Sequence, residues 1–293
     1  MKKLTFILLI TIYASAMAQQ KPILLFPNGA PGEQSGLMIE KEDLTGNKTA
    51  GCPVSRISNV SEPTITFYPA PMDNNSGATI IVNPGGGYNI LAYNLEGTEI
   101  CKRFNSFGIN CVLVKYRVPR REGLPKHAAP LQDLQRAIAY TRSHAKEWNI
   151  DENRIGVMGF SAGAHLSVMA SNNFNQLTYP AIDENDKVNL RPDFCILIYP
   201  AYLDGENFGL APEVTVTSKT PPTFLVQAQD DKNYINSSLF YYYALKEAGV
   251  ASAMHLYPSG GHGYGLRNTG DLVNEWPFRA VSWLRDIGML EKN

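Results

Sequence analysis

The sequence has no excess of charge of either sign, since 26 lysines and arginines stand against 27 aspartates and glutamates among 293 residues. The balance stays slightly acidic when the first 18 residues, with Lys2 and Lys3, are left out. A chain without a basic surplus has little electrostatic attraction for nucleic acid or anionic lipid. We therefore expect neither nucleic acid nor a membrane among its partners.

Long apolar runs are absent as well, because no segment reaches the roughly 18 residues that a membrane-spanning helix needs. The apolar stretch from Leu4 to Tyr13 follows two lysines and precedes the small residues Ala14 to Ala18. This order is typical of a signal peptide, here residues 1–18, cleaved after Ala18. The sequence thus predicts a secreted or periplasmic protein in which residues 19–293 form a single domain.

Cysteine is scarce, with only four residues, which is too few for a disulfide framework in a chain of this length. Cys111 and Cys195 fall in apolar strand-like runs and Cys101 in a helix-like segment, so these three are predicted to be buried free thiols. A bridge from Cys52 to one of them stays open. Metal-binding motifs such as HExxH or paired histidines are missing, and we expect no metal and no cofactor.

Short apolar runs alternate with longer amphipathic segments, and each change of period is marked by Gly, Pro or Asn. This alternation predicts an α/β fold with a mostly parallel, doubly wound sheet flanked by helices. The predicted strands are 64–68, 78–83, 111–116, 154–158, 194–199, 223–227 and 253–257. The predicted helices are 96–107, 131–148, 162–172, 236–248 and 275–287. Several strands are apolar on both faces, as strands covered on both sides must be.

A candidate nucleophile, Ser161, lies in the segment Gly159-Phe160-Ser161-Ala162-Gly163, between an apolar strand and a helix. A GxSxG motif alone is weak, but in this context it indicates a sharp turn that lifts a serine hydroxyl clear of the sheet. The flanking glycines provide the room that such a turn needs. The amide of Ala162, at the helix start, can then donate to an oxyanion.

A serine hydroxyl needs a base and an acid that orients the base. Of the five histidines, His262 is the best candidate because it lies in a glycine-rich loop after the last predicted strand, with His127 as a weaker rival. Asp230 and Asp231 follow the preceding strand, so either can supply the acid. The resulting order of Ser, Asp and His is the order of α/β-hydrolases.

Three glycines, Gly85 to Gly87, come one residue after the predicted strand 78–83, behind Pro84. Backbone amides without side chains can converge on one anion, as an acyl-transfer enzyme requires opposite Ala162. The loop matches neither a Walker motif nor GxGxxG, so the sequence favours an oxyanion hole over a phosphate site.

Taken together, the motifs PGGGY, KYRVP, GFSAGAHL and GGHGYGLR resemble the α/β-hydrolase superfamily, and within it the secreted acetylxylan-esterase-like group of carbohydrate acetyl esterases. The resemblance runs from about Leu24 to Leu290. It implies Ser161 as nucleophile, His262 as base and Asp231 as acid. It also implies oxyanion donors from Gly86, Gly87 and Ala162. The chain departs from the family at Pro84, where related esterases carry the histidine of HGGG.

The expected function is a serine esterase that removes acetyl groups from plant-type polysaccharide or oligosaccharide through an acyl-enzyme. The polar segment between Tyr199 and Thr223 lacks a long apolar lid, which disfavours a lipase. Tyrosines near the candidate loops can stack on sugar rings, and we expect Tyr88 and Tyr264 to bind substrate. The other tyrosines near these loops are Tyr93, Tyr202 and Tyr234. The alternatives are a feruloyl, aryl or short-chain carboxylesterase, a dipeptidyl-type peptidase, and a catalytically silent carbohydrate-binding protein.

Overall fold

The computed structural model describes residues 21–33 and 39–291, and the predicted signal peptide lies outside these residues. An eight-stranded sheet has the order β1-β4-β7-β5-β8-β9-β10-β11. Its strands are β1 (Ile23–Leu24), β4 (Thr64–Tyr68), β5 (Thr79–Asn83), β7 (Asn110–Lys115), β8 (Ile155–Phe160), β9 (Cys195–Ile198), β10 (Thr223–Ala228) and β11 (Ser252–Tyr257). From β7 to β11 every neighbouring pair is parallel, and β4 is antiparallel to both β1 and β7.

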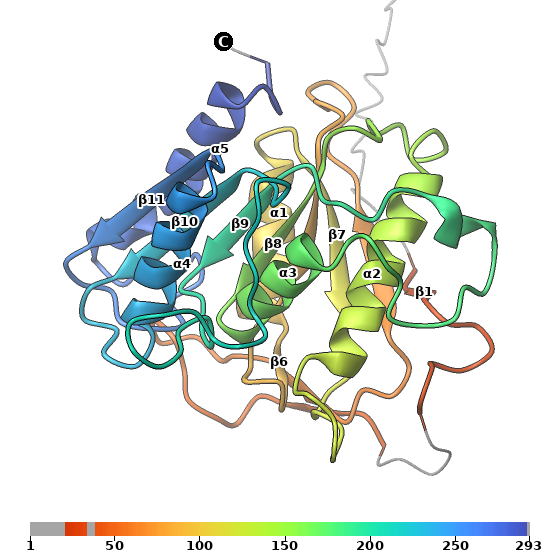
Figure 1. The fold of residues 1–293 in the computed structure, drawn as a ribbon, viewed down its shortest axis with the longest axis horizontal. Coiled ribbons are helices and arrows are strands. Elements are labelled where there is room, and N and C mark those ends of the chain that lie inside the picture. The colour runs from red at the N-terminus through yellow and green to blue at the C-terminus, as the bar shows by residue number, and fades with distance from the viewer. Residues whose placement is uncertain (1–20, 34–38, 292–293) are drawn as a thin grey trace, which may run out of the picture.

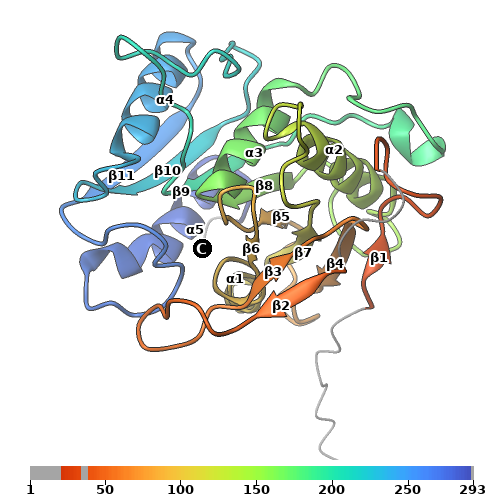
Figure 2. The same ribbon diagram turned by 90° about the horizontal axis from the view of Figure 1, so that it is seen from below.

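Helices cover both faces of this sheet, with α2, α3 and α4 on one side and α1 and α5 on the other (Figure 2). They span α1 (Glu99–Asn105), α2 (Ala128–Ser143), α3 (Ala162–Asn172), α4 (Ile235–Glu247) and α5 (Trp276–Asp286). Two separate apolar clusters result, one on each face of the sheet. The central strands β5, β8, β9 and β10 are buried throughout, which explains their apolar character on both faces.

Every predicted strand and helix is present, and the α/β fold class is confirmed. The largest difference is at α2, which begins at Ala128 and ends at Ser143 although residues 131–148 were expected. Pro130 lies in the first turn of α2. The backbone N–H groups of a first turn make no hydrogen bond within the helix, so a proline there loses none. The region from His144 to Asn149 forms turns instead of a further helical turn.

Short elements without a periodic signal were not predicted. A second, three-stranded sheet consists of β2 (Lys41–Asp43), β3 (Arg56–Ser58) and β6 (Leu91–Ala92). In Figure 1 β6 lies below the central sheet, at the end toward which β7 points. Residues 94–98 form a π-helical turn that leads into α1, and 3-10 turns occur at Glu184–Lys187 and Leu272–Glu275.

All four cysteines are free, and Cys101, Cys111 and Cys195 are buried as predicted, whereas Cys52 is exposed. Burial raises the pKa of the Cys101 thiol and that of Cys195, so both are protonated and unreactive at neutral pH. Among the residues that the structure describes, no helix is both long and apolar enough to cross a membrane.

Candidate active site

Ser161 lies at the junction of β8 and α3 with backbone angles φ 52° and ψ −117°, which few residues other than glycine adopt. The turn is possible because its glycine neighbours leave room for close backbone contacts. A Cβ atom at Gly159 would lie 2.1 Å from the carbonyl oxygen of Gly163, and one at Gly163 would lie 2.1 Å from that of Asn83. Any larger residue at these two positions would force the strand, turn and helix apart, as the motif predicts.

The structure brings Ser161, His262 and Asp231 together in one hydrogen-bonded chain. Nε2 of His262 lies 2.8 Å from Oγ of Ser161, and Nδ1 of His262 lies 2.7 Å from Oδ2 of Asp231. The Asp231 side chain is 2% exposed, whereas that of His262 is 29% exposed. A buried carboxylate behind a partly exposed imidazole is the arrangement that orients a general base toward a serine.

Further contacts hold the acid and the base in place. The side-chain amide of Gln227 donates a 3.2 Å hydrogen bond to Oδ2 of Asp231. The His262 ring packs between Tyr199 and Tyr234, with ring centroids 5.0 Å and 4.8 Å away. These neighbours restrict the rotation of the imidazole, so the hydrogen bond to Ser161 is formed without a ligand.

Asp230, the alternative to the favoured acid Asp231, has a different environment. Its carboxylate accepts hydrogen bonds from the amides of Gly261 at 2.8 Å and Gly260 at 3.4 Å. Asp230 therefore anchors the glycine-rich loop that carries His262, while Asp231 contacts the imidazole itself. His127, the weaker candidate base, packs beside His165 at a ring distance of 5.5 Å and does not line the cavity at Ser161.

The predicted oxyanion donors flank Ser161 on two sides. Gly86 and Gly87 line the same cavity as Ser161, and Ala162 begins α3 directly after it. No acceptor within residues 21–33 and 39–291 takes a hydrogen bond from the amides of these three residues. Such free amides at a loop and at a helix N-terminus can stabilise a developing negative charge.

Glu96, which was not predicted from the sequence, binds the backbone of the glycine loop. It is 3% exposed and accepts hydrogen bonds from the Gly85 amide at 2.6 Å and from the Tyr199 hydroxyl at 2.9 Å. Tyr199 in turn accepts a 3.1 Å hydrogen bond from the amide of Gly265, in the loop of His262. Burial raises the pKa of Glu96, and the two donated hydrogen bonds act in the opposite direction. The sequence does contain a signal for this role, since Glu96 is an acidic residue at the start of a helix face that is otherwise apolar.

The prediction that Tyr88 and Tyr264 bind substrate needs correction. Tyr88 and Tyr264 are 0% and 1% exposed, and neither lines the cavity at Ser161. Tyr88 turns inward at φ 60°, with its hydroxyl 2.8 Å from Nδ1 of His165. Tyr264 packs edge-on against Tyr199 at 4.5 Å. Both rings are therefore part of the core, where they cannot stack on a sugar.

The cavity at Ser161 has a volume of about 350 Å³ and is rimmed by other aromatic and polar groups. Tyr202 and Tyr234 line it on one side, and Thr49, Val54 and Arg56 line it on another. The Arg56 guanidinium donates hydrogen bonds to the carbonyls of Val54 and Asn47, at 3.1 Å and 2.7 Å. Asp43 lies opposite Arg56 in the pairing of β2 with β3, and the pKa of Asp43 is lowered by hydrogen bonds from Thr45 and also by the charge of Arg56.

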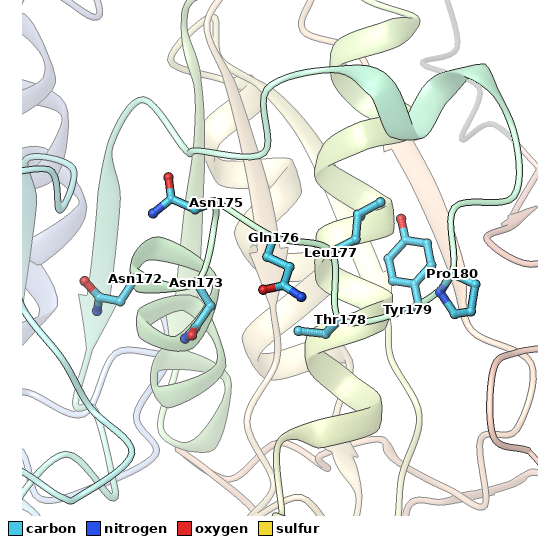
Figure 3. Close-up of a pocket in the computed structure, with 8 residues that line it drawn as sticks. All are labelled: Asn172, Asn173, Asn175, Gln176, Leu177, Thr178, Tyr179 and Pro180. Atoms are coloured by element: carbon cyan, nitrogen blue, oxygen red, sulfur yellow. The ribbon is translucent and has the colours of Figure 1, made fainter.

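A larger cavity of about 640 Å³ lies at the opposite end of α3 (Figure 3). It is lined by residues 172, 173 and 175–180, and Figure 3 shows amide side chains of Asn172, Asn173, Asn175 and Gln176 there. Because α3 is 11 residues long, this cavity is about 16 Å from Ser161 along the helix axis. It holds none of the three triad residues, so the smaller cavity is the candidate active site.

Comparison with known proteins gives consistent matches. The model of the BD-FAE family matches residues 66–194. An acetylxylan esterase of Xylanibacter ruminicola is 35% identical over 237 residues, which cover 76% of this chain and 48% of that protein. An endo-1,4-beta-xylanase B of Butyrivibrio fibrisolvens is 29% identical over 64% of this chain and 33% of its own length. The chain thus spans half or less of these two curated relatives.

A solved structure matches over nearly the whole chain. The acetyl ester-xyloside bifunctional hydrolase of Caldicellulosiruptor lactoaceticus superposes with a TM-score of 0.73 and 31% sequence identity. The match covers 94% of this chain and 100% of that one, so the likeness extends over nearly the whole of both chains.

Proposed function

The chain belongs to the α/β-hydrolase superfamily, in its acetylxylan-esterase-like group, and from this premise we propose that it is a serine carboxylesterase that removes acetyl groups from polysaccharide or oligosaccharide. The observation that supports this most directly is the hydrogen-bonded chain from Ser161 through His262 to Asp231, at 2.8 Å and 2.7 Å. In this proposal residues 19–293 are one catalytic domain, and no cofactor takes part.

The mechanism follows from these contacts. His262 takes the proton of the Ser161 hydroxyl through Nε2 while Oγ attacks the ester carbonyl carbon, and the buried Asp231 stabilises the imidazolium. The amides of Gly86, Gly87 and Ala162 bind the oxyanion of the tetrahedral intermediate. The bond from the carbonyl carbon to the sugar oxygen then breaks, and His262 gives the proton to this departing oxygen, leaving an acetyl group on Ser161. Water, deprotonated by the same imidazole, releases acetate.

The carbohydrate substrate is supported by the relatives and by the rim of the cavity. The similar proteins include an acetylxylan esterase and an acetyl ester-xyloside bifunctional hydrolase. The tyrosines at the rim, Tyr202 and Tyr234, offer amphipathic surfaces of the kind that sugar rings contact. A cavity of about 350 Å³ suits a small acyl group with its sugar outside.

A release assay tests the proposal. The protein and its Ser161→Ala variant are incubated with acetylated xylan, acetylated mannan, acetylated pectin, peracetylated xylose and methyl ferulate. We expect acetate from at least one carbohydrate and none above background from the variant. Cleavage of methyl ferulate alone would assign the chain to the aryl esterases. Failure to label Ser161 with a fluorophosphonate probe would support the silent carbohydrate-binding alternative.

We also propose that residues 1–18 are a cleaved export signal. The pattern of lysines, apolar run and small residues supports cleavage after Ala18. N-terminal sequencing of the protein from a bacterial periplasm or culture medium should then begin at Gln19. Recovery of the intact chain from the cytoplasm would contradict this proposal and leave the proposed chemistry untouched.

A further inference from the structure

Three side chains that can ligate a metal ion converge outside the triad. His127 lies just before α2, His165 lies in α3, and Glu213 belongs to the segment between β9 and β10. Their ligand atoms all lie within 4.8 Å of one another. Nδ1 of His127 and Nε2 of His165 are buried without a hydrogen-bond partner in the part of the chain that the structure describes. Buried polar atoms rarely stay unpaired, so two such atoms in one cluster indicate a missing partner.

We propose that His127, His165 and Glu213 bind a divalent transition metal ion of the zinc class. Imidazole nitrogens and carboxylate oxygens form the donor set that Zn²⁺ and its neighbours in the first transition row prefer. Three protein ligands leave a fourth position for water in a tetrahedral site. No metal was expected from the sequence, because these ligands are far apart in the chain and form no spacing motif.

The distances fit this coordination after a small adjustment. Nε2 of His165 lies 3.6 Å from Oε1 of Glu213, which is too long for a hydrogen bond. With bonds of about 2.1 Å to zinc, two tetrahedral ligand atoms lie about 3.4 Å apart, close to this separation. His127 is the ligand that must approach. Its side chain is only partly buried and lies at the end of a loop, so a shift of about 1 Å requires no change in the core.

The hydrogen bonding of His165 leaves one of its ring nitrogens available to a metal ion. The other ring nitrogen of His165, Nδ1, lies 2.8 Å from the Tyr88 hydroxyl. With the Nδ1 proton donated to Tyr88, the lone pair of Nε2 is free for the ion. Such an outer hydrogen bond is a common feature of histidine ligands.

The ammonium group of Lys126 competes with the metal ion for the carboxylate of Glu213. This ammonium lies 3.1 Å from Oε1 of Glu213 and 4.7 Å from the ring centroid of Tyr202. It neutralises Glu213 in the ion-free protein, and the ion takes over this role when it binds. Because Tyr202 lines the cavity at Ser161, the cluster lies next to the candidate active site without being part of it.

The test uses untagged protein stripped with EDTA and dialysed. Zn²⁺ is titrated by calorimetry, and Co²⁺ is followed through its visible absorption, which reports tetrahedral nitrogen and oxygen ligation without any measurement of activity. The ligand variants are His127→Asn and Glu213→Gln, which change partly exposed side chains and should fold. Lys126→Gln is the matched control, since it removes a neighbour of both ligands but no donor. His262→Asn removes the triad imidazole as an alternative Zn²⁺ ligand.

We expect one equivalent of Zn²⁺ per chain and tetrahedral Co²⁺ bands. Affinity should fall at least about tenfold in His127→Asn and in Glu213→Gln, as loss of a ligand does. It should rise or stay unchanged in Lys126→Gln, where a competing charge and no ligand is lost, and it should stay within about threefold in His262→Asn, where no ligand is lost. Absence of binding to the wild-type protein would overturn the proposal. Binding that disappears in His262→Asn but persists in the ligand variants would also overturn it, because the ion would then occupy the triad.

Discussion

Replacing Glu96 by glutamine should separate the role of the glycine loop from that of the triad. The Glu96 carboxylate accepts one hydrogen bond from the Gly85 amide at 2.6 Å and another from the Tyr199 hydroxyl at 2.9 Å. Glutamine has nearly the same shape but only one acceptor oxygen. Its NH₂ group must therefore face either the Gly85 amide or the Tyr199 hydroxyl, which already accepts a hydrogen bond from Gly265.

The expected magnitude follows from the lost contact. A hydrogen bond to a charged group contributes about 1.5–3 kcal/mol, and a buried donor left without a partner costs about 1–3 kcal/mol. We expect the free energy of unfolding of Glu96→Gln to fall by about 2 kcal/mol. Loss of a complete oxyanion donor lowers kcat about 10²–10³-fold. Since the Gly85 to Gly87 loop is displaced and not removed, kcat should fall about tenfold. KM should change much less.

The assay is the hydrolysis of p-nitrophenyl acetate together with urea unfolding of the same proteins. Glu99→Gln is the matched control, because Glu99 lies three residues further on and pairs with Arg267 at 2.7 Å near the surface. It should keep its kcat. Tyr199→Phe removes the same contact from the other side, so its effect should not add to that of Glu96→Gln. A Glu96→Gln protein with unchanged kcat and unchanged unfolding would refute the reasoning.

Four further substitutions test the candidate site. Ser161→Ala should lower kcat/KM for p-nitrophenyl acetate by at least about 10⁴-fold while leaving the urea midpoint near that of the wild type. Asp231→Asn should lower kcat about 10⁴-fold. Asp230→Asn keeps an acceptor for the amides of the His262 loop and should lower kcat less than about tenfold. Equal losses of kcat in the two variants would contradict the assignment of Asp231 as the acid. Tyr88→Phe should reduce stability by about 1 kcal/mol through the lost contact with His165. Because Tyr88 is buried, the KM for acetylated carbohydrate should not change, and a raised KM would restore its role in substrate binding.

The sequence predicted the regular elements and the loop residues at the strand ends because both depend on local patterns. Apolar runs and helical periodicity locate the strands and helices, and GxSxG, the glycine loop and His262 lie in the loops that follow strands. The sheet then brings these loops together, since the carboxyl ends of parallel strands share one edge. The strands β2, β3 and β6 have two or three residues each, which is too short to show a period.

Side-chain direction in irregular loops could not be predicted. Tyr88 was expected at the rim because it follows the glycine loop, but its positive φ turns the ring into the core. The choice between Asp230 and Asp231 likewise depends on the tight turn after β10, in which the Asp231 amide donates to the carbonyl of Ala228. Neighbouring residues of a turn point in different directions, and the sequence does not show which one meets the imidazole.

Such loops also explain why buried polar groups surround this site. A loop of three glycines gives a substrate oxygen free access to its amides, but it has no side chains that fix its shape and much conformational entropy to lose. Its position must therefore come from outside the loop. Glu96 binds the amide of Gly85, and the Tyr116 hydroxyl donates to the carbonyl of Pro84. On the other side, Tyr88 joins the loop to His165, whose amide in turn bonds to the carbonyl of Ser161. These contacts fix the amides of the glycine loop relative to the amide of Ala162 at the start of α3 before a substrate binds, as electrostatic preorganisation requires.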